Sequence, residues 1–185
     1  MSRPPKVVLV AGLSGVGKSY VIEHLRSTSD RFLHFSAGSL IQKKRLDMER
    51  DELRLFDNEG ILQNQYMLVE QFAEEVDRAS SSSNKTILFD AHMLIDTDQD
   101  IVVVPFDVFE KINPVTFVFL KEDPHKILER RTADTSRARP MRSAKEIREH
   151  QDESLKLAHE YADKLGVLLK VANSSQLDLI ADFLK

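Results

Sequence analysis

The sequence GLSGVGKS at residues 12–19 matches the pattern G-x-x-x-x-G-K-[S/T] at every fixed position. Three of the six glycines in the chain fall within this stretch, so a residue that costs backbone entropy is concentrated in one place. Glycines allow the backbone N–H groups of such a loop to turn toward a phosphate, and the helix that follows adds partial positive charge. The stretch therefore predicts a loop that binds the phosphates of a nucleotide.

The segments on either side of this loop have the patterns of a strand and a helix. Val7 to Ala11 is a continuous aliphatic run, which is typical of a strand covered on both faces in a parallel sheet. After the glycines, Val21, Ile22 and Leu25 form one apolar face of a helix predicted over 18–27. A strand, a glycine loop and a helix in this order are the context that the motif requires, which favours phosphate binding over a plain connecting turn.

Strands and helices continue to alternate through the rest of the chain. Asp123-Pro124 marks the start of one helix, Ser143 with Glu146 forms a capping box that opens a longer one, and Gly166 marks its end. Residues 173–175 are expected to cap a final helix. Further strands are predicted over 32–35, 86–89, 115–120 and 167–172, helices over 61–79, 123–131 and 143–165, and a small hairpin between 93–95 and 101–104.

This alternation predicts an α/β fold, a three-layer P-loop NTPase domain with a five-stranded, mostly parallel sheet. The length of 185 residues is typical of one domain, so we expect residues 1–185 to form a single unit.

Composition excludes several functional classes. The chain has no cysteine, which excludes disulfides and thiolate sites, and its net charge of −4 argues against binding duplex nucleic acid through phosphate neutralisation. The apolar run near the N-terminus is too short for a signal peptide or a membrane span. We expect a cytoplasmic protein with no membrane association and no obligate protein partner.

The phosphate loop also predicts roles for its own polar residues. Lys18 is expected to bridge the β- and γ-phosphates, and the Ser19 hydroxyl to bind Mg²⁺. ATP is favoured over GTP because the Asn-Lys-x-Asp stretch of the switch GTPases does not occur in the sequence. The residues assigned to binding ATP are Gly12, Ser14, Gly15, Val16, Gly17, Lys18, Ser19 and Tyr20.

A second basic segment runs from residue 130 to residue 142. It holds five arginines and few apolar residues, and it is expected to be mostly a loop: Arg130, Arg131, Arg137, Arg139 and Arg142. Guanidinium groups bind phosphates by bidentate contacts and neutralise charge on a transferred group. Beside a phosphate loop, this segment favours a phosphate clamp over a solvated basic loop.

These motifs, taken in order, resemble those of the adenylate kinase family, and within it the short-lid archaeal type. The resemblance covers nearly the whole chain. Besides the phosphate loop it rests on Arg50-Asp51-Glu52-Leu53-Arg54, Asp90-Ala91-His92, Asn113-Pro114, Arg130-Arg131 with Asp134, Arg137 and Arg139, and Glu149-His150-Gln151.

The resemblance implies a nucleoside monophosphate kinase that transfers the γ-phosphoryl group of ATP to AMP with Mg²⁺. It implies a helical acceptor-binding region over about 37–80 and a short lid over about 132–142. Arg131, Arg137 and Arg139 would close over the transferring group, Arg50 and Arg54 would bind the acceptor phosphate, Asp90 would orient a water bound to Mg²⁺, and His92 would lie by the acceptor pocket.

Two departures from the family pattern leave the acceptor open. Residues 93–100 lack the Ser/Thr-rich, glycine-containing segment that would help to recognise the acceptor base, and Gln42 stands where an arginine commonly follows. A nucleoside, sugar or other metabolite therefore remains an alternative acceptor, and a nucleotide-binding regulatory protein with slow ATPase activity is a third possibility. In each case the predicted partners are small molecules.

Overall fold

The computed structural model describes residues 4–44, 57–79, 85–136 and 139–185. A five-stranded sheet with strand order β2-β3-β1-β6-β7 forms the middle layer, and all of its strand pairs are parallel. The predicted α/β architecture with a five-stranded sheet is therefore confirmed. The strands are β1 (Lys6–Ala11), β2 (Phe32–Ser36), β3 (Thr86–Asp90), β6 (Thr116–Leu120) and β7 (Leu168–Ala172).

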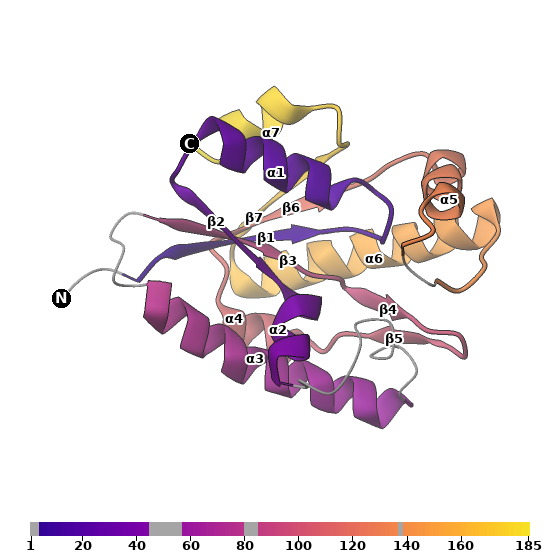
Figure 1. The fold of residues 1–185 in the computed structure, drawn as a ribbon, viewed down its shortest axis with the longest axis horizontal. Helices are drawn as coiled ribbons and strands as arrows, with labels where there is room; N and C mark the ends of the chain where they lie inside the picture. The colour runs from indigo at the N-terminus through magenta and orange to yellow at the C-terminus, as the bar shows by residue number, and fades with distance from the viewer. Residues whose placement is uncertain (1–3, 45–56, 80–84, 137–138) are drawn as a thin grey trace.

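Helices cover both faces of the sheet (Figure 1). On one face lie α1 (Lys18–Thr28) and α7 (Leu177–Phe183), and on the other α2 (Ala37–Lys44), α3 (Asn58–Ala79), α4 (Phe106–Ile112) and α6 (Ala144–Leu165). Helix α5 (Pro124–Ala133) lies beyond the carboxyl ends of the strands, near the β4–β5 hairpin (Leu94–Asp96 and Ile101–Val103) (Figure 1).

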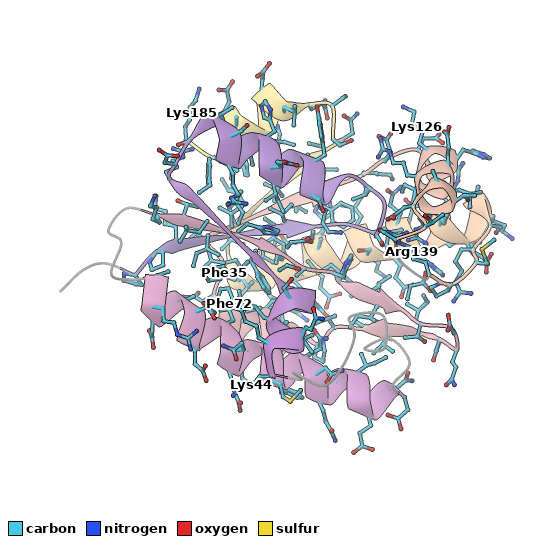
Figure 2. The ribbon with its side chains drawn as sticks, viewed as in Figure 1. Phe35, Lys44, Phe72, Lys126, Arg139 and Lys185 are labelled. Atoms are coloured by element: carbon cyan, nitrogen blue, oxygen red, sulfur yellow. The ribbon has the colours of Figure 1, made fainter. Side chains whose placement is uncertain are left out.

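The central strand β1 shows why its sequence is continuously apolar. Leu9 packs into the core beneath α3 and α4, whereas Val8 and Val10 pack into the core beneath α1. Because both faces are covered, alternation with polar residues is not needed. The core beneath α3 also contains the edge-to-face pair of Phe35 and Phe72, whose ring centroids lie 6.0 Å apart (Figure 2).

The predicted helix ends agree with the structure in three places. Asp123 caps α5 by accepting from the backbone N–H groups of the first turn, Ser143 and Glu146 form the capping box of α6, and Gly166 ends α6 in the left-handed conformation. Each of these signals depends on residues within one helical turn of each other, which is why the sequence alone locates them.

Two other helix predictions were wrong. Residues 173–175 do not cap the final helix, since its N-cap is Gln176 and Asn173 Oδ1 instead accepts from Ser175. The helix predicted to end at residue 131 continues to Ala133, so Thr132 is still helical. Helix α4 was not predicted, because seven residues behind Pro105 give too short a periodic pattern to distinguish a helix from a loop.

Within the described part of the chain, no helix is long and apolar enough to cross a membrane.

Candidate active site

The phosphate loop lies between β1 and α1 at the carboxyl ends of the parallel strands, where ligands bind in open α/β sheets. Gly12 starts the loop with φ of +140°, and a Cβ atom there would lie 2.7 Å from the carbonyl oxygen of Leu120. Only glycine fits this close approach of β6 without distortion. Ser19 and Tyr20 lie in the first turn of α1 and are exposed.

Lys18 folds back over the loop that precedes it. Its side chain is buried, and Nζ donates to the carbonyl oxygens of Gly12 at 2.8 Å and Leu13 at 3.1 Å. The ammonium group also lies 3.8 Å from Oδ1 of Asp90. The loop therefore holds a cation at its centre and faces it with a carboxylate.

The sheet register explains why Asp90 reaches this position. Asp90 is the last residue of β3 and pairs with Val10, two residues before the loop begins. His92, two residues further on, donates from Nδ1 to the carbonyl oxygen of Gly12 at 2.9 Å. The structure thus places both Asp90 and His92 beside the phosphate loop.

The Asp90 carboxylate has the character of a ligand-binding group. Its Oδ1 atom is buried and, among the described residues, accepts no hydrogen bond. Buried oxygens are costly to leave unpaired, so such an atom in a site indicates a water, ion or substrate partner. Within the described residues no cluster of three or more ligating side chains occurs.

Three arginines from α5 and the segment after it contact the loop directly. Arg131 donates from Nε to the Ser14 carbonyl at 2.9 Å, and Arg139 donates from Nε to the Ser14 hydroxyl at 3.1 Å. Arg130 donates from Nη1 to the Val16 carbonyl at 3.1 Å. Two of the arginines predicted to close over the transferring group, Arg131 and Arg139, therefore lie against the loop that would hold it.

Asp96 links this arginine segment to the β4–β5 hairpin. Its carboxylate lies 3.5 Å from Nη1 of Arg131 and accepts from Arg142 Nη2 at 3.0 Å, while Arg142 also donates to the Thr97 carbonyl. Burial lowers the pKa of the Arg131 guanidinium from its ordinary value, and the charge of Asp96 opposes this shift. The sequence analysis did not identify Asp96, whose partners are distant in sequence.

Asp134 holds Arg139, the first described residue after residues 137–138, in place. It pairs with Arg139 and accepts from the hydroxyl and backbone N–H of Ser136. The hydrogen bonds from Ser136 and then from Arg139 hold the pKa of this carboxyl well below its ordinary value. The Asp134 carboxylate is therefore charged at neutral pH.

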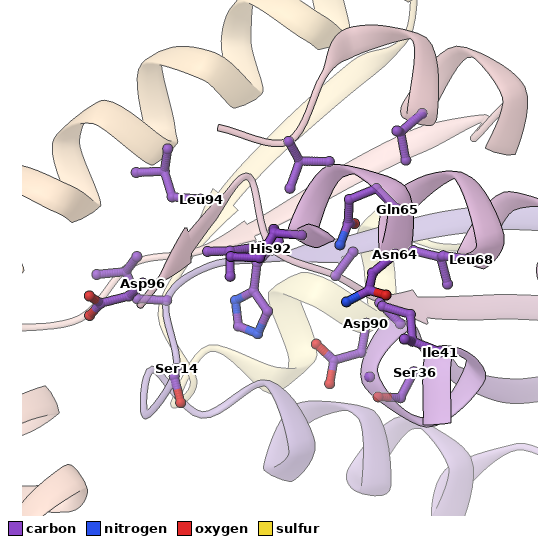
Figure 3. A pocket seen from close by; sticks show the side chains of 18 of the residues that line it. Ser14, Ser36, Ile41, Asn64, Gln65, Leu68, Asp90, His92, Leu94 and Asp96 are labelled. Atoms are coloured by element: carbon purple, nitrogen blue, oxygen red, sulfur yellow. The ribbon is translucent and has the colours of Figure 1, made fainter. Parts of the chain in front are cut away.

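A cavity of about 220 Å³ opens beside the phosphate loop (Figure 3). Its lining next to the phosphate loop is polar and consists of Ser14, Asp90, His92, Asp96, Arg131 and Arg139. The rest of its lining is mainly apolar, with residues from α3, α4, the end of β3 and the residue after β5: Ile61, Leu68, Phe89, Val104, Val108, Phe109 and Ile112. This arrangement suits a molecule with an anionic group at one end and a flat apolar group at the other.

The remaining predicted site residues Arg50, Arg54 and Arg137 lie outside the described residues. The sequence analysis in turn missed two polar residues of the cavity, Asn64 and Gln65 on α3. The signal was present in the sequence, because Asn64 and Gln65 interrupt the apolar stripe between Ile61 and Leu68 at helical spacing.

Comparisons with known proteins identify relatives over most of the chain. The family model described as an AAA domain matches residues 11–148. An adenylate kinase from Pyrococcus horikoshii is 29% identical over 178 residues, which cover 93% of this chain and 88% of that relative. An adenylate kinase from Thermococcus kodakarensis is 30% identical over 179 residues, with the same coverage of both chains.

Among solved structures, a shikimate kinase from Bacteroides thetaiotaomicron matches with a TM-score of 0.60 and 11% sequence identity. The match covers 97% of this chain and 96% of the other. It supports the fold described above.

Proposed function

This chain belongs to the adenylate kinase family, and from that membership and the geometry of its site we propose that it transfers the γ-phosphoryl group of ATP to AMP. One observation carries the proposal. Lys18, Asp90, Arg131 and Arg139 lie around the phosphate loop, and the last three also line the cavity of about 220 Å³. The loop suits the donor nucleotide, and the cavity suits the acceptor.

In the proposed reaction a phosphate oxygen of AMP attacks the γ-phosphorus of ATP. The bond between that phosphorus and the oxygen bridging the β- and γ-phosphates breaks, and two molecules of ADP form. The attacking oxygen is already anionic, so no general base is required. Catalysis then depends on positioning the two nucleotides and on stabilising the charge of the transferred group.

Each basic group has a role in this scheme. The carbonyl oxygens that Lys18 Nζ now contacts are weaker partners than phosphates, so we assign Nζ to the β- and γ-phosphates of bound ATP. Arg131 and Arg139, with Arg137, are assigned to the transferred group, and Arg50 and Arg54 to the acceptor phosphate. Exclusion of water by closure of the lid region would suppress hydrolysis of ATP.

The residues present fit a magnesium ion bound together with ATP. Mg²⁺ takes oxygen ligands and is commonly held through one or two carboxylates and the phosphates of the substrate. Oδ1 of Asp90, which accepts no hydrogen bond from the described residues, and the hydroxyl of Ser19 are the oxygens that we assign to it, Asp90 acting through a bound water. When bound, the ion neutralises charge on the phosphates.

The proposed partners are therefore nucleotides of low molecular weight. We also propose that the protein works in the cytoplasm.

The test is an assay of ADP formation from ATP with AMP, CMP, UMP, GMP or water in turn. We expect turnover that depends on AMP. The variants Lys18→Ala and Arg131→Ala should each reduce that turnover by about 10²-fold or more, as removal of one preorganised charge-stabilising group commonly does. Circular dichroism should show that both variants remain folded.

Two further variants complete the test, one at Arg131 itself and one away from the cavity. Arg131→Lys keeps the charge but loses the planar fork of the guanidinium, so it should also impair turnover. Arg78→Ala removes an exposed arginine at the end of α3, far from the cavity lining, and should leave turnover unchanged. Full activity of folded Lys18→Ala or Arg131→Ala, or ADP formation that is independent of any acceptor, would contradict the proposal.

A further inference from the structure

Two amide side chains lie in the wall of the cavity, where apolar residues would pack equally well. Asn64 is 2% exposed and Gln65 is 6% exposed, and both belong to the core-facing side of α3 between Ile61 and Leu68. Figure 3 shows both amides on the side of α3 that faces His92 and Asp90. Both residues line the cavity.

The amide oxygen of Asn64 accepts no hydrogen bond from the described residues. This atom, Oδ1, is buried. A buried amide oxygen that accepts no hydrogen bond destabilises the folded chain. Because this amide lies in the wall of a cavity, we infer that a bound molecule supplies its hydrogen-bond partner.

The surroundings define which part of a nucleotide could reach this amide. Phosphate groups suit the part of the cavity next to the phosphate loop, which Arg131 and Arg139 line. The apolar interior near Phe109 and Leu68 suits the flat face of a base. An amide set among these apolar side chains faces the edge of such a base.

The chemistry of an amide selects among bases. It offers a donor and an acceptor side by side, which matches the 6-amino group of adenine and the ring nitrogen next to it. Guanine presents two acceptors, O6 and N7, along the corresponding edge, so the amide oxygen would remain unpaired. We propose that Asn64, together with Gln65, recognises the base of the acceptor nucleotide and selects adenine over guanine.

The polar side chains Asp96 and Thr97 of the β4–β5 hairpin are already engaged with other residues, which supports this assignment. In the family pattern, the segment in the place of residues 93–100 would help to recognise the acceptor base, and this chain departs from that pattern. Among residues 93–100, Asp96 is paired with arginines, Thr97 bonds to Asp100, and Leu94 contributes an apolar side chain to the cavity. Hydrogen-bonding recognition of the base therefore comes from α3.

The inference rests on the proposed transfer to AMP. Its test measures kcat and KM for AMP and for GMP at saturating ATP. The KM for ATP is measured as well. Asn64→Leu keeps the approximate size of the side chain and removes both hydrogen-bonding groups. We expect its selectivity for AMP over GMP to fall at least tenfold, with KM for ATP changed less than twofold. Asn64→Asp replaces the donor by a second acceptor, which matches neither the ring nitrogen of adenine nor O6 and N7 of guanine, so it should raise KM for both AMP and GMP.

Gln71 provides a matched control on the same helix. It is a buried glutamine that donates to Glu74 and is not part of the cavity wall, so Gln71→Leu should leave the selectivity ratio unchanged. Stability gives an independent readout. Because Asn64→Leu removes an unpartnered polar group, its melting temperature should equal or exceed that of the original chain.

The outcomes separate this inference from the proposed function. If the original chain turns over AMP but Asn64→Leu keeps its preference for AMP over GMP within twofold, the role of Asn64 is refuted and the kinase assignment stands. If the original chain shows no turnover that depends on AMP, both are refuted.

Discussion

Replacement of Gly12 by alanine tests whether the phosphate loop has the geometry described above. The backbone of Gly12 has φ of +140°, and an added Cβ would lie 2.7 Å from the carbonyl oxygen of Leu120 and 3.1 Å from Val16 Cγ1. The Leu120 carbonyl belongs to the end of β6, in the centre of the sheet, and cannot turn aside as a side chain would. The loop itself must move.

The expected cost has two parts. An unfavourable backbone conformation costs about 1–3 kcal/mol, and overpacking of a well-packed region costs about 1–3 kcal/mol. Their sum for Gly12→Ala is about 4 kcal/mol, which at roughly 2–4 °C per kcal/mol lowers the melting temperature by roughly 8–16 °C.

Gly166→Ala is the matched control. Gly166 also has a positive φ, +67°, but an added Cβ there would meet no atom within 4 Å. Only the conformational part of the cost applies, about 1–2 kcal/mol. The difference between the two variants therefore isolates the contact with Leu120.

Urea denaturation followed by circular dichroism measures the free energy of unfolding of both variants, and the ADP assay measures function. Because the Gly12 carbonyl accepts from both Lys18 and His92, Gly12→Ala should also impair turnover, whereas Gly166→Ala should not. Equal losses of stability in the two variants would show that Leu120 does not crowd position 12.

Two further predictions concern stability away from the loop. Ser143→Ala removes the hydroxyl that accepts from the Glu146 N–H and should lower the free energy of unfolding by about 1 kcal/mol. Ser175→Ala, measured by the same urea denaturation, should not lower it. Equal losses in the two variants would count against the capping box. Burial, assisted by the charges of Glu160 and Asp107, raises the pKa of Tyr161 above its ordinary value of 10.0, so the folded state favours the neutral phenol. The contribution of the neutral Tyr161 phenol to stability is complete below pH 10 and declines as the pH rises above 10, because Tyr161 loses its proton first in the unfolded chain. Between pH 9 and pH 11 the original chain should therefore lose more stability than Tyr161→Phe. Parallel losses in the two proteins would refute the raised pKa of Tyr161.

Local sequence signals predicted the parts of the fold whose causes are local. The glycine pattern and its flanking strand and helix located the phosphate loop, and the Ser143–Glu146 box and Gly166 located the two ends of α6. The start of α7 was misplaced because Asn173 bonds within its own turn and Gln176 takes the N-cap position. Both arrangements are compatible with the same short run of polar residues.

The candidate site was predictable in proportion to how close its members lie in sequence. Lys18 and the loop form one continuous segment, so their association follows from the motif. Asp90 was predicted from its place at the end of a strand, but its ion pair with Lys18 depends on the register that sets β3 beside β1. Asp96 was missed as a site residue, because Arg142, its partner, is 46 residues away along the chain.

The sequence by itself determined that this chain has a phosphate-binding loop between a buried strand and a helix, because the required backbone conformation is encoded within eight consecutive residues. Only the tertiary structure decided what faces that loop. The packing of α3, α4 and the β4–β5 hairpin places Asn64 in the wall of a cavity that Arg131 also lines. That arrangement depends on contacts between segments far apart in sequence, and no local pattern records which of them will meet.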